Sequence, residues 1–225
     1  FVLLALATGS FVASGLSGAF GQKVTPVTMV RVGIAAEIIG VAGLGLVITA
    51  ESTWLVVVPF LFVYGIGVGL ATAQLTGVVL KDVPVSQSGQ GSGTSSTARQ
   101  IGSALGIAVL GTVLFTSVGA TLDAKLAEVP GLPVETQSQI VDAVVDSAGS
   151  VIPSLEAQSP ELADAAREAF SDGTRYSAYA AAGFLVLGFL ATLRLSGTAP
   201  HAEPRPEEAA PGESLPAAEA AGEPA

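Results

Sequence analysis

Long apolar stretches alternate with shorter polar segments along most of this chain. An α-helix needs roughly 20 apolar residues to cross a bilayer, with a range of about 17–25. Stretches of that length with few or no charged side chains occur repeatedly. The pattern therefore predicts an all-α integral membrane protein with five transmembrane helices, at residues 1–20, 30–49, 54–80, 99–118 and 176–194.

Two polar segments are too long to be simple turns. Residues 119–174 form a net acidic loop, within which residues 135–148 and 160–170 have helical periodicity. The loop has few large apolar side chains, so we do not expect a separate catalytic domain in it. Residues 196–225 are rich in Pro, Ala and Glu, and we expect a disordered tail there.

The second helical segment of the loop has a single apolar stripe. Its start is signalled by Ser159, Pro160 and Glu161, which suit the N-cap and first turn of a helix. We expect the stripe to rest on the membrane interface or on the body of the protein. Its members are Leu162, Ala165, Ala166, Ala169 and Phe170.

Composition and charge exclude several classes of protein. Half of the residues are hydrophobic, 12% are charged and the mean hydropathy is +0.63, whereas soluble domains carry about 25% charged residues. Most of the net charge of −10 lies in the acidic loop and the tail, and there is no basic patch for nucleic acid. The chain has no cysteine, and its single histidine, His201, lies in the tail. We therefore expect no enzyme, no cofactor and no metal site.

The distribution of Lys and Arg predicts the orientation in the membrane. The predicted spans place six basic residues on the side of the membrane opposite the acidic loop: Lys23, Arg31, Lys81, Arg99, Arg194 and Arg205. The remaining basic residues are spread through the long loop, where they count less. We therefore expect the tail to be cytoplasmic and the acidic loop to be extracytoplasmic. Because Phe1 lies inside an apolar run, we interpret the chain as a fragment that lacks its N-terminal part.

Small residues recur at helical spacing within the predicted spans. Gly65 and Gly69 belong to such a stripe in the third span, and Gly102 and Gly106 form a GxxxG pair at the start of the fourth. Without side chains at these positions, helix backbones can approach closely in lipid. We therefore predict helix packing at all four glycines. A nucleotide-binding loop is excluded, because no Lys-Ser/Thr follows the glycines.

Two polar residues inside the spans are candidates for function. Glu37 shares a helix face with Gly33 and Gly40, which suggests that it faces the bundle interior. In a functional role, Glu37 would take up and release a proton or attract a cationic substrate. In a packing role, it would hydrogen-bond to a neighbouring helix. Gln74, deep in the third span, would line a substrate path or join two helices.

The polar stretch between the third and fourth spans carries two further candidates. It is rich in Gly and Ser, and we interpret it as a water-exposed hinge that ends where the fourth helix opens at Arg99 or Gln100. Lys81 and Arg99 are predicted to anchor the cytoplasmic helix ends. A gating ion pair between Arg99 and Asp82 is the alternative.

This same stretch carries a resemblance to a known family. Its residues Val83-Pro84, the Gly/Ser-rich run 89–96, Arg99-Gln100-Ile101-Gly102 and 106–111 (Gly-Ile-Ala-Val-Leu-Gly) stand at fixed offsets. This pattern is similar to that near the C-terminal end of drug/proton antiporters of the major facilitator superfamily, in the branch with fourteen helices. The order of the predicted helices and the long acidic loop fit the same resemblance.

The resemblance implies the C-terminal part of a major facilitator helical bundle in the plasma (inner) membrane of a bacterium. It implies export of lipophilic small molecules in exchange for protons, by alternating access around a site near the midplane. The partners would be the lipid bilayer, protons, a small-molecule substrate and the missing N-terminal half. The alternative is a non-transport helical membrane scaffold, or a subunit of a larger membrane complex.

Overall fold

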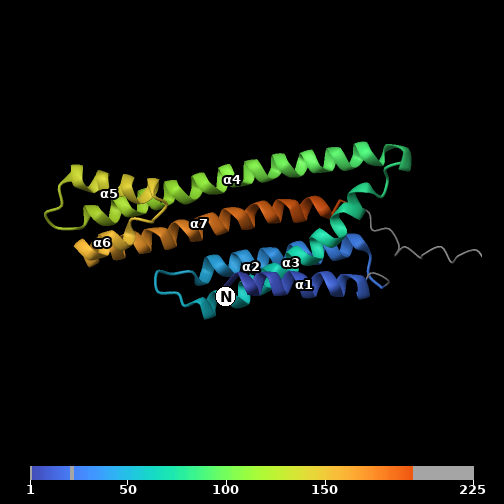
Figure 1. Ribbon diagram of the computed structural model, residues 1–225, viewed down its shortest axis with the longest axis horizontal. Coiled ribbons are helices and arrows are strands. Elements are labelled where there is room, and N and C mark those ends of the chain that lie inside the picture. The colour runs from blue at the N-terminus through green and yellow to red at the C-terminus, as the bar shows by residue number, and fades with distance from the viewer. Residues whose placement is uncertain (1, 21–22, 195–225) are drawn as a thin grey trace, which may run out of the picture.

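The computed structural model describes residues 2–20 and 23–194, and each regular element in these residues is helical. The predicted tail, 196–225, lies outside the described residues. The elements in chain order are α1 (Val2–Phe20), α2 (Pro26–Val47), α3 (Trp54–Leu80), the 3-10 turn η1 (Val85–Gln87), α4 (Ser88–Ala127), α5 (Val134–Asp146), α6 (Ile152–Gln158) and α7 (Pro160–Thr192) (Figure 1).

The helices are layered along one common direction. α3 packs along both α1 and α2, and α7 lies between this group and α4 (Figure 1). α3 and α4 follow each other in sequence but contact each other only sparsely. α4 and α7 run side by side past the end of the α1–α3 group, and α5 and α6 pack on their far parts. α7 is therefore the helix that connects the two halves of the structure.

Length and composition identify helices that can cross a membrane. α2, α3 and α4 are long and apolar enough to do so, and α1 contains a shorter apolar segment, Leu3–Gly15. Large apolar side chains such as Phe11 and Ile107 are exposed, at 83% and 74%, as expected where lipid or another helix covers them. These features are those of a helical membrane protein, and the count of five spans remains a prediction.

The start of α4 differs from the prediction. We expected a Gly/Ser-rich hinge up to Arg99, but the helix begins at Ser88, which confines the hinge to residues 81–87. Ser and Gly are weak helix formers, yet a helix that the following apolar residues have nucleated extends at one hydrogen bond per residue. Cooperative extension therefore outweighs the low propensity of residues 88–98.

The predicted loop at 119–174 is largely helical. α4 continues to Ala127, and α5 and the start of α7 confirm the two helical segments expected from periodicity. The end of α4, α5, α6 and the start of α7 pack together, and we call this group, residues 118–170, the helical cap. Its buried core consists of Val118, Leu122, Leu126, Val144, Ala166 and Ala169.

The cap core supports the second of the two positions expected for the apolar stripe of residues 160–170, on the body of the protein. The stripe packs on α4, α5 and α6, where partly buried Leu162, Ala165 and Phe170 surround the core. The loop therefore forms a packed core although it has few large apolar side chains. Many small contributions from four helix segments add up when they face one another.

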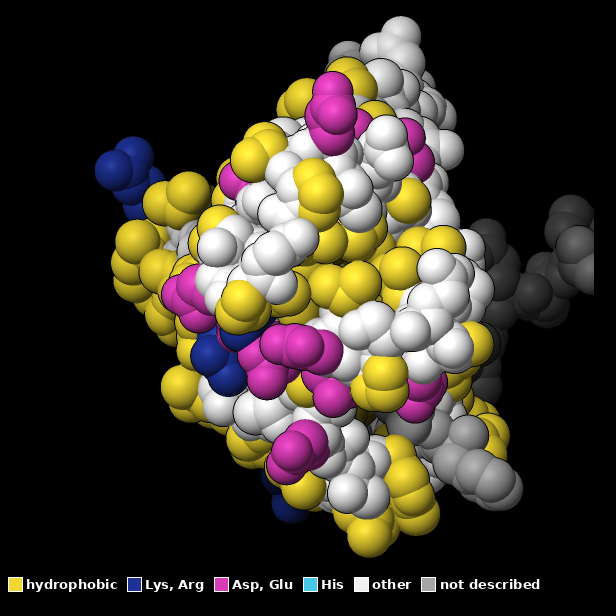
Figure 2. All heavy atoms as spheres, turned by 90° about the vertical axis from the view of Figure 1, so that its left-hand side faces the viewer, with side chains coloured by type: hydrophobic (Ala, Val, Ile, Leu, Met, Phe, Trp, Pro, Cys, Tyr) yellow, Lys and Arg dark blue, Asp and Glu magenta, His cyan; other side chains and the backbone are white. Residues whose placement is uncertain are grey.

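Ion pairs join the helices on the outside of the cap. Lys125 of α4 pairs with Glu168 of α7, and Arg167 of α7 pairs with Glu156 of α6 and with Asp164. Figure 2, which looks at this end of the molecule, shows acidic and basic side chains grouped there. The hydrogen bond from Lys125 to Glu168 raises the pKa of Lys125. Such exposed pairs contribute about 0–1 kcal/mol each, so the apolar core is the main source of cap stability.

The contact between α2 and α7 is held by hydrogen bonds to helix-end carbonyls. Near the start of α2, Arg31 donates from Nε and Nη2 to the carbonyl of Thr192, at 3.2 and 2.8 Å. Near the end of α2, Arg175 of α7 donates to the carbonyl of Ile48 at 3.2 Å. A cation at a helix C-terminus is favourable because the last carbonyls lack intrahelical partners. The two antiparallel helices therefore cap each other's ends.

Replacing Leu122 by Ala tests whether the cap has a cooperative core. Leu122 is fully buried, at 0% exposure, so we expect L122A to lower the free energy of unfolding of the cap by about 2–5 kcal/mol. Hydrogen exchange should then speed up in α5 and in the first turns of α7. Val134→Ala is the control, since Val134 is 79% exposed. Equal exchange in the two variants would contradict a packed core.

Candidate functional site

The glycines of α3 bring its backbone close to two helices at once. A Cβ at Gly69 would lie 2.5 Å from the carbonyl oxygen of Ser10, and one at Gly65 would collide with the carbonyl of Leu6. A Cβ at Gly67 would lie 2.5 Å from the carbonyl oxygen of Gly33. Gly65 and Gly69 therefore face α1 and Gly67 faces α2. The contacts of Gly65 and Gly69 are those of a packing interface.

Glu37 lies at this α2–α3 contact. A Cβ at Gly67 would come within 2.6 Å of Glu37 Cγ, so Glu37 occupies the space that the missing side chain leaves. Gly33 and Gly40 flank it on the same face of α2, and Gly40 packs on Tyr64 of α3. The side chain is half-buried, and its carboxylate has no hydrogen-bond or ion-pair partner within the described residues. It is thus a carboxylate near the middle of an apolar helix, packed against the backbone of α3 at Gly67.

Gln74 forms a hydrogen bond between helices. Its Nε2 donates to Ser17 Oγ of α1 at 2.7 Å, and Ser17 in turn lies 3.7 Å from the sulfur of Met29 in α2. Ser17 is buried, at 2% exposure. This contact links α3 to α1 and corresponds to the joining role that we considered for Gln74. The alternative role, in which Gln74 lines a substrate path, remains a prediction.

The hydrogen bonds of the α1 serines to α3 are what sequence reasoning missed. Ser10 Oγ donates to the carbonyl of Gly65 at 3.0 Å, and Ser17 receives Gln74 on the same side of α1. Ser10, Ser14 and Ser17 are spaced by four and three residues, which places them on one helix face. That spacing was the available signal for an interhelical polar contact.

The structure does not bring Glu37 and Gln74 together. Glu37 packs at Gly67, and Gln74 lies seven residues further along α3, or about 10 Å at 1.5 Å per residue.

A polar cavity of about 650 Å³ lies away from both residues, between the α2–α3 turn and α7, and is lined by residues that include Glu51, Ser171 and Arg175. Ser171 Oγ and Arg175 Nε, the buried side-chain atoms without a partner among the described residues, belong to its lining. A space so polar and roomy suits water.

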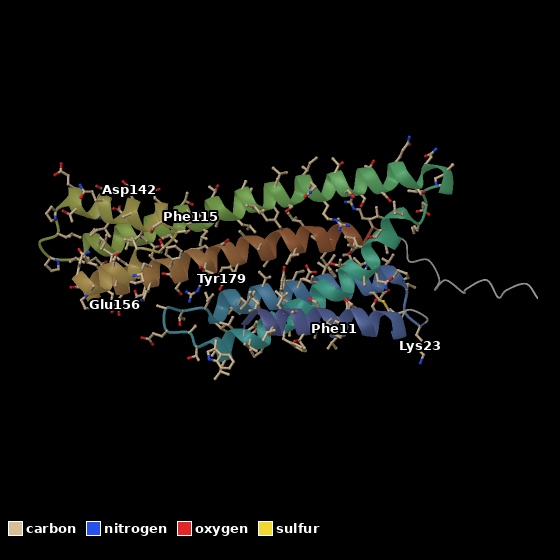
Figure 3. All side chains as sticks on the ribbon, viewed as in Figure 1. Phe11, Lys23, Phe115, Asp142, Glu156 and Tyr179 are labelled. Atoms are coloured by element: carbon tan, nitrogen blue, oxygen red, sulfur yellow. The ribbon has the colours of Figure 1, made fainter. Side chains whose placement is uncertain are left out.

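The glycines of α4 differ from those of α3. A Cβ at Gly102 or Gly106 would meet nothing within 4 Å. The predicted GxxxG packing therefore has no partner in the described part of the chain, and it stays a prediction that needs another helix. Figure 3 shows the side chains of this half of α4 pointing outward over much of its length.

Lys81 and Arg99 lie at the same end of the molecule: Lys81 begins the hinge, and Arg99 lies in α4 beyond it. Asp82 pairs with Lys81 at 3.8 Å and forms no ion pair with Arg99 among the described residues, which disfavours the gating pair considered above. Arg99 is exposed and lines a cleft between α3 and α4. Its position at the boundary between the polar and apolar parts of α4 suits an interfacial anchor.

Comparison with known proteins identifies drug exporters as relatives. The chain is 33% identical over 136 residues to the multidrug resistance protein Stp of Mycobacterium tuberculosis, covering 58% of the chain and 25% of that protein. It is 26% identical over 172 residues to the multidrug efflux pump LfrA of Mycolicibacterium smegmatis, covering 76% of the chain and 33% of that pump.

A third relative is the drug efflux pump JefA of Mycobacterium tuberculosis, 29% identical over 147 residues, with 65% of the chain and 28% of the pump covered. The chain thus spans about a quarter to a third of the length of these proteins. No family model and no solved structure matches it.

The glycine contacts predict unequal costs of adding a methyl group. Gly69→Ala would place its Cβ against the Ser10 backbone, which cannot move aside without shifting α1. We expect it to destabilise the protein by about 1–3 kcal/mol. Gly77→Ala is the control in the same helix, because a Cβ there meets nothing within 4 Å. Thermal unfolding in detergent should separate the two, and equal melting temperatures would contradict close α1–α3 contact.

A double-mutant cycle tests the hydrogen bond between Ser17 and Gln74. We expect Ser17→Ala and Gln74→Ala to be non-additive, with a coupling of about 0.6 kcal/mol and at most about 1.7 kcal/mol, as found for hydrogen bonds in lipid. Unfolding of the two single variants and the double variant gives the coupling. Full additivity would show that the two side chains do not interact in the membrane.

Proposed function

We propose that the chain is the C-terminal part of a proton-coupled exporter of lipophilic small molecules. Two findings support this. The relatives are named drug efflux pumps, and Glu37, packed between helices that can span a membrane, has no hydrogen-bond or ion-pair partner among the described residues. In this proposal α1, α2, α3, the apolar part of α4 and the second half of α7 are the last five spans of a fourteen-helix major facilitator bundle.

Glu37 is the proposed proton carrier. An ionised side chain at the bilayer centre costs roughly 2.5–3.5 kcal/mol on insertion scales, so a carboxyl with no partner gains by taking up a proton. A change of access from one side of the membrane to the other, or the arrival of a cationic substrate, would favour its release. Coupling follows if binding of the proton and binding of the substrate compete at or near Glu37.

The exchange also needs a pathway that this chain does not form alone. We propose that an N-terminal half of the same protein completes the cavity, and that transport proceeds by rocking of the two halves around a central site. The open face of α4 at Gly102 and Gly106 is where a further helix would pack closely. The chain by itself is then expected to insert into the bilayer but not to transport a substrate.

The proposed orientation places the hinge 81–87 on the cytoplasmic side and the helical cap outside. Lys23, Arg31, Lys81, Arg99 and Arg194 all belong to the hinge side, which favours the cytoplasm by the distribution of basic residues. Because the relatives are bacterial proteins, the proposed membrane is the plasma membrane of a bacterium, with the tail in the cytoplasm. A non-transport membrane scaffold is the alternative, and the packed cap would then be its external binding surface.

Glu37→Gln in the intact protein tests proton coupling. The amide keeps the size of the side chain but cannot exchange a proton, so we expect efflux of a lipophilic cation such as ethidium to lose its dependence on the proton gradient. The assay is dye transport in proteoliposomes with an imposed pH gradient. Glu51→Gln, in the turn after α2, is the control and should transport normally.

Three outcomes separate the hypotheses. Loss of gradient-driven efflux in E37Q alone supports coupling through Glu37. Normal coupling in E37Q would leave Glu37 with a packing role and refute it as the carrier. Absence of any transport by the intact, folded protein would favour the scaffold.

A further inference from the structure

α3 and α4 enclose a cleft next to the hinge. The helices meet near Gly91, where a Cβ would lie 3.0 Å from Leu80 Cδ2 and 3.1 Å from Val83 Cγ1, and they share few other contacts. They therefore diverge on moving away from the hinge, as the right-hand part of Figure 1 shows. The space between them is about 560 Å³, which is large enough for part of a lipid chain.

The two walls of the cleft differ in chemistry. The α3 wall is apolar and is formed by Leu75, Val79 and Leu80. The α4 wall carries Thr94, Ser95 and Arg99. Ser95 and Arg99 are neighbours on one helix face at i and i+4, and Thr94 borders the same cleft. The cleft is thus apolar on one side and has hydroxyl and guanidinium donors on the other.

The position of the cleft coincides with a polarity boundary in both helices. α3 changes from apolar to charged at Leu80 and Lys81, and α4 changes from polar to apolar at Arg99 and Gln100. Headgroups of a bilayer lie at such boundaries, where Arg and Lys side chains favour the interface. The guanidinium of Arg99 has no hydrogen-bond or ion-pair partner among the described residues.

We propose that this cleft binds one anionic glycerophospholipid. An acyl chain would lie along Leu75 and Val79, and the phosphate would accept hydrogen bonds from Arg99 and from the hydroxyls of Thr94 and Ser95. Guanidinium pairs with phosphate through two parallel hydrogen bonds, which an ordinary neutral donor cannot match. Basic pockets between membrane helices recognise acidic lipids in this way.

The charge of the cleft decides between lipids. Arg99 is the only charged residue in its lining, and no carboxylate lines it. A phosphatidylglycerol headgroup carries a net negative charge and gains from Arg99, whereas a phosphatidylcholine headgroup brings its own cation and gains less. One basic residue near the membrane surface contributes a preference of roughly fivefold. The site does not depend on the transport proposal, since it needs only α3, α4 and the hinge.

Native mass spectrometry of the intact protein tests this site. The protein is released from micelles that contain equal amounts of phosphatidylglycerol and phosphatidylcholine, and the retained lipid is identified. We expect one phosphatidylglycerol to be kept in preference to phosphatidylcholine. Arg99→Gln should reduce that preference roughly fivefold, and Val79→Trp, which fills the apolar wall, should reduce retention of both lipids.

Arg194→Gln is the matched control. Arg194 follows α7 at the hinge end but does not line the cleft, so R194Q should retain lipid as the unaltered protein does. Equal retention of the two lipids by the unaltered protein would overturn the proposal. So would wild-type preference in both R99Q and V79W, or displacement of phosphatidylglycerol by millimolar inorganic phosphate, which would point to a small anion.

Discussion

Close backbone contact of α3 with α1 and α2 is the constraint on which the rest of the structure depends. Lipid is as apolar as leucine, so apolar side chains alone do not drive membrane helices together, and contact area and hydrogen bonds must do so. Gly65 and Gly69 supply that contact towards α1, and Gly67 supplies it towards α2. The space left at Gly67 also receives the stem of Glu37. The candidate proton carrier therefore owes its position to an absent side chain on the neighbouring helix.

The second half of the molecule is attached to the first through α7. α4 contacts α7 extensively and α3 only sparsely, although α3 precedes it in the chain. The α2–α7 contact is in turn fixed at both ends, by Arg31 on the Thr192 carbonyl and by Arg175 on the Ile48 carbonyl. If α4 moves relative to α1–α3, it must either carry α7 along and break these α2–α7 hydrogen bonds, or separate from α7 and lose their extensive contact. The cap core buries side chains of both α4 and α7, which favours joint movement of these two helices.

Sequence reasoning succeeded where one helix decides the outcome alone. Apolar length was enough for α2 and α3, and the face shared by Gly33, Glu37 and Gly40 does point at α3. It failed where several segments act together. Each cap segment carries too few large side chains to predict a core, and only the packing of Leu122, Val144 and Ala166 from three helices forms one. The identity of the partner of a polar residue was equally hidden. The sequence allowed Gln74 to join two helices, but it did not identify Ser17 as the partner.

The two glycine pairs show most clearly what a motif leaves open. Gly65-Gly69 and Gly102-Gly106 have the same spacing in apolar helices. The first pair touches a neighbouring backbone, whereas the second meets no other helix in the described part of the chain. A glycine within a helix costs about 1 kcal/mol relative to alanine, and in α3 close packing offsets that cost. In α4 no contact within the described residues does so. The cost is offset only if another helix packs there, so the open face of α4 is the part of the structure that most favours a larger bundle over an isolated membrane scaffold.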